Sequence, residues 1–234
     1  MSSTRPRGVE QVARSALMPF QPVWTLVIPV KETVIAKSRL SDFPPGLRQR
    51  LAFAFAQDAV TAAVSCPDVR RVVVVTNDSG GSRLTDLGAD VVPDRPDAGL
   101  NPALHHAAGL IRRHDPAASV AAMSADLPAL RALDLSIALS SSPAPRWFVA
   151  DRAGDGTTLL AATASADLSP RFGARSAAAH RASGAVELTD ERLGRLRLDV
   201  DTSADLRLAV ELGLGPHTTE VLRQVLRQHH PPNR

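Results

Sequence analysis

"WTLVIPV", residues 24–30, decides the fold class of this 234-residue chain. The run is short, apolar and rich in β-branched residues, which is typical of a strand buried on both faces. Residues 46–66 follow with helical spacing of apolar side chains, and "RRVVVVTND", residues 70–78, indicates a second buried strand. A strand, a helix and a strand in this order predict a βαβ unit, and therefore an α/β fold built on a mostly parallel sheet.

The same alternation continues along the chain, with strands and helices predicted in turn over residues 89–94, 101–115, 119–126 and 127–142. Further strands are predicted at residues 146–152, 157–164, 184–189 and 195–201. Helices at residues 203–213 and 219–228 close the chain, and residues 164–183 are expected to form an inserted loop region. We therefore expect one domain, with a mixed, mostly parallel sheet flanked by helices.

Composition excludes several classes of function. With 44% hydrophobic and 22% charged residues and no apolar run near the roughly 18 residues that span a bilayer, we expect a soluble, cytoplasmic protein with no membrane partner. Cys66 is the only cysteine, which excludes an internal disulfide and a cysteine-rich zinc site. The net charge is +3 and the arginines are dispersed among acidic residues, while 3% aromatic residues offer few rings on which bases could stack, so no nucleic-acid partner is expected.

Lys31 and Lys37 are the only lysines among 27 basic residues. One interpretation is chance retention on a solvated loop; the other is a compact ammonium group that contacts phosphate, where lysine and arginine are not interchangeable. With Arg39, both follow the first predicted strand, at the edge where α/β sheets bind ligands, and could surround a triphosphate. The loop carries neither a dinucleotide-binding nor a P-loop glycine pattern, so neither of those mechanisms applies.

Aspartates follow two of the predicted strands. Asp126 ends the strand in "MSADLPAL", and Asp199 and Asp201 lie in "LDVDTSADL". We expect only one of the latter two to join Asp126, where a pair of carboxylates would suit magnesium completed by phosphates and water. The alternative is that Asp126 caps the next helix, and that Asp201 does so together with Thr202 or Ser203.

Two glycine-containing stretches, residues 151–162 and 170–185, combine small residues with hydroxyl side chains. Such loops can enclose a phosphate or carboxylate through backbone N–H groups and hydroxyls, although ordinary hairpins and solvated loops have the same composition. His105 and His106 are expected on a helix surface, and His180 receives no assignment.

Several motifs together resemble one family. "PVK" with "AKSRL", then "GLN", "DLPAL", "FVADRAGDGTTLL", "RFGARSAAAHRASGA" and "LDVDTSADL" are similar to the phosphoenolpyruvate and 2-phospho-L-lactate guanylyltransferases of deazaflavin-coenzyme biosynthesis, of the actinobacterial type. The resemblance implies a nucleotide-diphospho-sugar-transferase-like, Rossmann-like fold over residues 23–216. Residues 1–22 would then be a mobile extension, and residues 217–234 a C-terminal helix and tail.

The resemblance also implies the roles of particular residues. Asp126 and Asp199 would hold Mg²⁺. The acceptor phosphate would bind the glycine-rich loops, at Thr157, Gly173 and Ser176. GTP would bind residues of the first loop and of the second predicted helix, namely Lys31, Lys37, Arg39 and Asn101.

The implied reaction joins GTP and phosphoenolpyruvate to give enolpyruvyl-diphospho-5'-guanosine and pyrophosphate. The phosphorylated three-carbon acid could instead be 2-phospho-L-lactate or 3-phosphoglycerate, and a catalytically silent nucleotide-binding regulatory module is the alternative from another class. Two partner questions stay open at this point: whether the chain forms a homodimer, and whether an unstable product passes directly to the next enzyme of the pathway.

Overall fold

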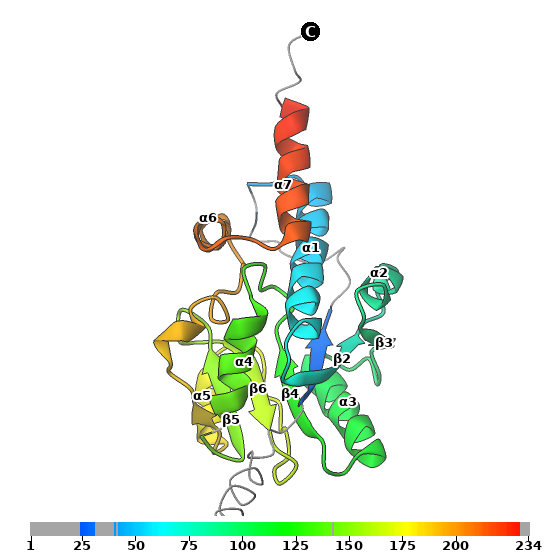
Figure 1. Ribbon diagram of the computed structural model, residues 1–234, viewed down its shortest axis with the longest axis vertical. Helices are drawn as coiled ribbons and strands as arrows, with labels where there is room; N and C mark the ends of the chain where they lie inside the picture. The colour runs from blue at the N-terminus through cyan, green and yellow to red at the C-terminus, as the bar shows by residue number, and fades with distance from the viewer. Residues whose placement is uncertain (1–23, 31–39, 41, 142, 230–234) are drawn as a thin grey trace, which may run out of the picture.

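The computed structural model describes residues 24–30, 40, 42–141 and 143–229 (Figure 1). The strands within these residues are β1 (Trp24–Pro29), β2 (Val69–Val75), β3 (Asp90–Val92), β4 (Ser119–Met123), β5 (Arg146–Ala150), β6 (Thr157–Ala162) and β7 (Val186–Glu187). The helices are α1 (Pro45–Val64), α2 (Gly81–Thr85), α3 (Leu100–His114), α4 (Ala132–Ser141), α5 (Ser176–Ala182), the 3-10 helix η2 (Glu191–Leu193), α6 (Ser203–Leu212) and α7 (Pro216–His229). The mixed α/β fold predicted from the sequence is confirmed.

The described strands form one seven-stranded sheet in the order β3-β2-β1-β4-β6-β5-β7. β1 pairs in parallel with β2 and with β4, whereas β6 runs antiparallel to both of its neighbours, β4 and β5. Because β6 is reversed, Thr157 at its amino end lies at the same edge as the carboxyl ends of β4 and β5. This edge carries the residues discussed below.

Helices cover both faces of the sheet, and strand alternation decides which side chain meets which helix. Val72 and Val74 point to the face covered by α1 and α4, and Val73 and Val75 to the face covered by α3 and α5 (Figure 1). On the first face, the rings of Trp24 in β1 and Trp147 in β5 meet edge to face, with centroids 5.1 Å apart and planes at 88°.

A third cluster joins the amino-terminal part of α1 to α6 and α7, and Figure 1 shows α7 running beside α1. Asp58, a buried residue of α1, accepts hydrogen bonds from the backbone N–H groups of His217 and Thr218, each at 2.9 Å. It thereby satisfies donors that the first turn of α7 leaves unpaired. A Cβ at Gly215 would lie 2.3 Å from the Asp58 carboxyl carbon, so only glycine fits before this helix.

Three local predictions were wrong or incomplete. Residues 164–183 contain the helix α5, the short helix α2 was not predicted, and no strand forms at residues 195–201. Within residues 195–201 only Val200 bonds to the segment that follows β4: its N–H lies 3.0 Å from the carbonyl oxygen of Asp126. A single bond of this kind is not enough to form a β-ladder.

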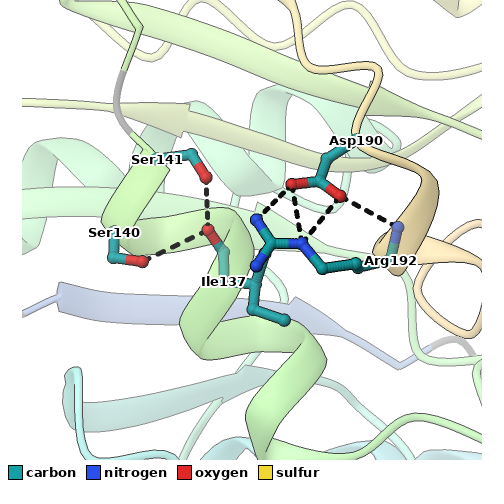
Figure 2. Close-up of polar contacts among 5 residues, drawn as sticks. All are labelled: Ile137, Ser140, Ser141, Asp190 and Arg192. Atoms are coloured by element: carbon teal, nitrogen blue, oxygen red, sulfur yellow. Dashed lines mark hydrogen bonds and ion pairs between the residues drawn. The ribbon is translucent and has the colours of Figure 1, made fainter.

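Before that segment the chain turns through η2, close to the end of α4 (Figure 2). Asp190 accepts hydrogen bonds from the backbone N–H of Arg192 at 2.9 Å and from its guanidinium, and these bonds lower the pKa of Asp190 to about 2. On α4, the hydroxyls of Ser140 and Ser141 donate to the carbonyl oxygen of Ile137 (Figure 2). The bonds of Asp190 shape the turn at η2, the serine bonds lie within the last turn of α4, and both groups lie outside the candidate site.

Candidate active site

Asp126 and Asp199 come together at the carboxyl edge of the sheet. Asp126 follows β4, and the hydrogen bond from Val200 N–H to the Asp126 carbonyl draws the segment of Asp199 alongside. Asp126 does not cap a helix, because α4 begins only at Ala132. At the start of α4 the carboxylate of Asp134 accepts a hydrogen bond from the Arg131 N–H at 2.9 Å, and so caps the helix in place of Asp126.

The acidic surroundings change the titration of Asp199. Burial raises its pKa first, and the charges of Asp126, Asp201 and Asp151 raise it further, to about 7. The expectation that only one of Asp199 and Asp201 joins Asp126 stays a prediction: Asp126 acts on Asp199, and so does the charge of Asp201.

Asp201 is also not the cap of α6. Thr202 occupies that position: its hydroxyl accepts from the Asp205 N–H at 3.2 Å, and the Asp205 carboxylate accepts from the Thr202 N–H at 2.8 Å. The pair forms a capping box, whose Thr-x-x-Asp spacing is visible in the sequence.

Asp151 is a residue that the sequence did not single out. It follows β5, and its carboxylate oxygens accept from the N–H groups of Asp155 at 3.0 Å and Gly156 at 2.7 Å. A Cβ at Gly156 would lie 2.4 Å from the Asp151 carboxylate, so this turn depends on glycine. The turn delivers the chain to Thr157 at the start of β6.

The donor set of this edge fits a hard divalent cation. Among the described residues, no group of three or more His, Cys, Asp or Glu side chains has the arrangement of a complete metal site. Magnesium, however, is commonly held by one or two carboxylates, with substrate phosphates and water completing its octahedron. Asp126 and Asp199 match that pattern, and a cation would offset the repulsion that raises the pKa of Asp199.

The three residues expected to bind the acceptor lie on neighbouring segments. Thr157 and Ser176 are buried, at 6% and 1% exposure, and Gly173 precedes α5 with a φ of 126°, a conformation that favours glycine. The Ser176 N–H donates to the Gly173 carbonyl at 3.2 Å, and the Ala177 N–H donates to the Asp155 carbonyl at 3.0 Å. The two glycine-containing loops are therefore joined through the first turn of α5.

His180 lies in α5, fully buried, between these loops. Its Nδ1 is 2.9 Å from the Thr157 hydroxyl oxygen, and its Nε2 is 2.9 Å from the backbone nitrogen of Arg171. Burial, together with the charges of Arg146 and Arg171, lowers the pKa of His180 to about 4, so the ring is neutral near pH 7. His105 and His106 are exposed on α3, as predicted.

Asn101 holds the loop before Gly173. Its amide oxygen accepts from the Phe172 N–H at 2.8 Å, and its amide nitrogen donates to the Phe172 carbonyl at 2.9 Å. These contacts join Asn101 to the loop before Gly173, and its contact with a nucleotide stays a prediction. Lys31, Lys37 and Arg39 lie outside the described residues, as does the expected extension at residues 1–22. Val30, the last described residue before Lys31, donates its N–H to the carbonyl oxygen of Val75 in β2.

None of the helices that the structure describes combines the length and the apolar character needed to cross a bilayer.

In overall shape the chain is similar to solved nucleotide-handling enzymes. A structure described as a nucleotide-diphospho-sugar transferase of Desulfovibrio desulfuricans G20 matches with a TM-score of 0.63 and 16% identity, over 89% of this chain and 98% of that one. A cytidylyltransferase of Leptospira borgpetersenii matches with a TM-score of 0.53 and 12% identity, over 89% and 95%. At these identities the likeness establishes the fold, and it agrees with the predicted nucleotide-diphospho-sugar-transferase-like class.

Sequence relatives narrow the family. The phosphoenolpyruvate guanylyltransferase of Streptomyces coelicolor is 52% identical over 206 residues, which are 87% of this chain and 97% of that protein. The enzyme of the same name from Thermomonospora curvata is 52% identical over 197 residues, 83% of this chain and 86% of that protein. A family model described as "Guanylyl transferase CofC like" matches residues 24–232. With a match of this extent, the chain belongs to the CofC-like guanylyl transferases.

Proposed function

We propose that this protein transfers GMP from GTP to phosphoenolpyruvate, giving enolpyruvyl-diphospho-5'-guanosine and pyrophosphate. The names of its relatives support this acceptor. The observation that carries the proposal is the meeting, at one edge of the sheet, of the Asp126–Asp199 carboxylate pair with the buried hydroxyl of Thr157. The carboxylate pair suits a cation bound with a polyphosphate, and the hydroxyl suits the phosphate of a smaller acid.

In the proposed mechanism the protein aligns two polyanions that repel each other. Asp126 and Asp199 would hold Mg²⁺, which when bound neutralises charge on the triphosphate. Lys31, Lys37 and Arg39 are proposed to contact the triphosphate. Asn101 is proposed to contact the nucleotide, or to support the loop that binds the acceptor through its bonds to Phe172. Thr157, Gly173 and Ser176 are proposed to bind the phosphate of the acceptor.

The chemistry then requires no covalent intermediate with the protein. A phosphate oxygen of the acceptor forms a bond to the α-phosphorus of GTP, while the bond from that phosphorus to the bridging oxygen of the β-phosphate breaks and pyrophosphate leaves. The acceptor oxygen is already negatively charged at neutral pH, so no general base is needed. Positioning and charge neutralisation are the contributions left to the protein.

A pyrophosphate-release assay tests the proposal. GTP, CTP, ATP and UTP are each paired with phosphoenolpyruvate, 2-phospho-L-lactate and 3-phosphoglycerate in the presence of Mg²⁺. GTP with phosphoenolpyruvate is expected to give the highest kcat/KM. Release with none of the twelve pairs would favour the silent regulatory module, and a preference for another acid would reassign the acceptor.

Variants separate the two halves of the site. Thr157→Ala and Ser176→Ala are expected to raise the KM of the acceptor and to leave that of GTP unchanged.

Lys31→Arg and Lys37→Arg keep the charge but widen the cation, and are expected to lower kcat/KM by about tenfold. Wild-type kinetics in both arginine variants would show that the lysines do not contact phosphate, and would favour their chance retention on a solvated loop.

A further inference from the structure

The buried ring of His180 has a defined partner at each nitrogen. The backbone nitrogen of Arg171, 2.9 Å from Nε2, can only donate, so Nε2 accepts this bond and carries no hydrogen. The lowered pKa of His180 keeps the ring neutral, and a neutral imidazole carries one N–H. That hydrogen is therefore on Nδ1, which faces the Thr157 hydroxyl at 2.9 Å.

The tautomer of His180 in turn fixes the direction of the Thr157 hydroxyl. A hydroxyl offers one hydrogen and two lone pairs, and the Nδ1–H of His180 takes a lone pair. The hydrogen of Thr157 must then point away from the ring. Within the described part of the chain His180 is the only side chain bonded to this hydroxyl, so its hydrogen is available to a ligand.

A phosphate oxygen is a fitting partner, because a phosphate dianion accepts hydrogen bonds and donates none. A hydroxyl that could rotate would present a lone pair to such a ligand part of the time. In the hydroxyl held by His180 one lone pair is already engaged and the hydrogen points away from the ring, which favours donation to the ligand. The bond to a charged acceptor is also stronger than one between neutral groups.

We infer that His180 is a positioning residue, which acts through Thr157 by presenting the Thr157 hydroxyl as a hydrogen-bond donor to the phosphate of the acceptor. The inference rests on the proposed function, since it assigns the Thr157 side of the site to the phosphorylated acid. The same ring also supports the loop before Gly173. It accepts from the Arg171 N–H, and the ring of Phe172 packs against it edge to face, with centroids 5.2 Å apart.

Two conservative variants separate these contacts. The amide of Asn can replace the Nδ1–H donor, and the carbonyl of Gln can reach the place of the Nε2 acceptor. His180→Gln therefore keeps the bond to Arg171 and loses the bond to Thr157, and is expected to raise the acceptor KM by about tenfold with the GTP KM unchanged. His180→Asn restores the donor to Thr157 and is expected to keep the acceptor KM within about threefold of wild type. His106→Gln, on the exposed face of α3, is the matched control.

A double-mutant cycle shows whether His180 acts through Thr157. If it does, His180→Gln combined with Thr157→Val should raise the acceptor KM no further than Thr157→Val does alone. Losses that multiply would mean that the two residues act independently, and this would overturn the inference. Melting temperatures of all the variants identify any that fail to fold.

The wild-type protein provides a test that needs no variant. Long-range ¹H–¹⁵N correlation NMR at pH 7 should show His180 as the neutral Nδ1–H tautomer. A ring protonated on Nε2, or on both nitrogens, would overturn the inference. Wild-type protein that transfers GMP to none of the acids would overturn the proposed function and with it the acceptor role of His180, whereas active protein with an unchanged acceptor KM in His180→Gln would overturn the role of His180 alone.

Discussion

Asp126 and Asp199 reach the site from distant parts of the sequence, and each brings a charge rather than core volume. We expect Asp126→Asn and Asp199→Asn each to lower kcat by about a hundredfold or more, because the neutral amide is a poor ligand for a hard cation. The fold should remain, as judged by circular dichroism and the melting temperature. Asp167→Asn, at a carboxylate whose side chain is 89% exposed, is the control and should match wild type. Near-normal activity in either test variant would remove that residue from the metal site.

The buried His180 makes stability depend on pH. Its pKa is about 4 in the folded protein against 6.5 for an ordinary histidine, so between these values the unfolded chain binds a proton that the native one does not. The contribution is complete above about pH 6.5 and is lost as the pH falls toward 4. From pH 7.5 to pH 5 we expect this group to lower the free energy of unfolding by about 2 kcal/mol.

Urea denaturation of wild type and His180→Gln at both pH values measures this contribution, because the variant lacks the titrating ring. The charges facing the ring come from Arg146 on β5 and Arg171 in the preceding loop, and both remain in the variant. An equal loss of stability in the two proteins would show that His180 is not the group responsible.

At the scale of elements, one side chain of α1 closes the start of α7. Asp58→Ala would leave unpaired the N–H groups of the half-buried His217 and the buried Thr218, and we expect a loss of about 2 to 4 kcal/mol in the free energy of unfolding. Thr202→Ala, which removes the more exposed cap of α6, should cost only about 1 kcal/mol. Chemical denaturation gives both values. A loss for Asp58→Ala no larger than that for Thr202→Ala would contradict the special role of the buried cap.

Elements with a strong periodic pattern were predictable from the sequence. The runs around Leu26 and Val73 have the length and β-branched content of buried strands, and both are in the sheet. Residues 195–201 misled the prediction because Leu196, Leu198 and Val200 alternate with polar residues, although only Val200 finds a strand end to bond. Helix α5 was missed because it is short and begins after a positive-φ turn at Arg175.

The position of Asp126 was predictable from the sequence, because Asp126 directly follows an apolar run that forms the strand β4. His180 could not be assigned in the same way, because its partners Thr157 and Arg171 come from other segments and no periodic pattern joins them. Asp151 was missed because its carboxylate is read from the sequence as part of a glycine turn, which in the structure it also stabilises.

At the scale of the whole molecule, metal removal should separate activity from folding. The proposed ligands lie at the edge of the sheet, outside the clusters that form the core. Excess EDTA is therefore expected to abolish turnover while the melting temperature of the substrate-free protein changes by less than about 2 °C, roughly what a few tenths of a kcal/mol produce in a domain of this size. Added Mg²⁺ should restore the activity. A large fall in the melting temperature would identify a structural metal instead.

The edge-to-face contact of Trp24 and Trp147 determines what intrinsic fluorescence and near-ultraviolet circular dichroism can measure in this protein. These are its only two tryptophans, and it has no tyrosine, so its intrinsic emission comes almost entirely from one ring pair. The pair bridges β1 and β5, which are separated in the sheet by β4 and β6, and both rings are shielded from water. Emission and near-ultraviolet ellipticity will therefore follow the opening of the central sheet as a single signal, and a ligand arriving at the carboxyl edge will need an extrinsic dye to be seen.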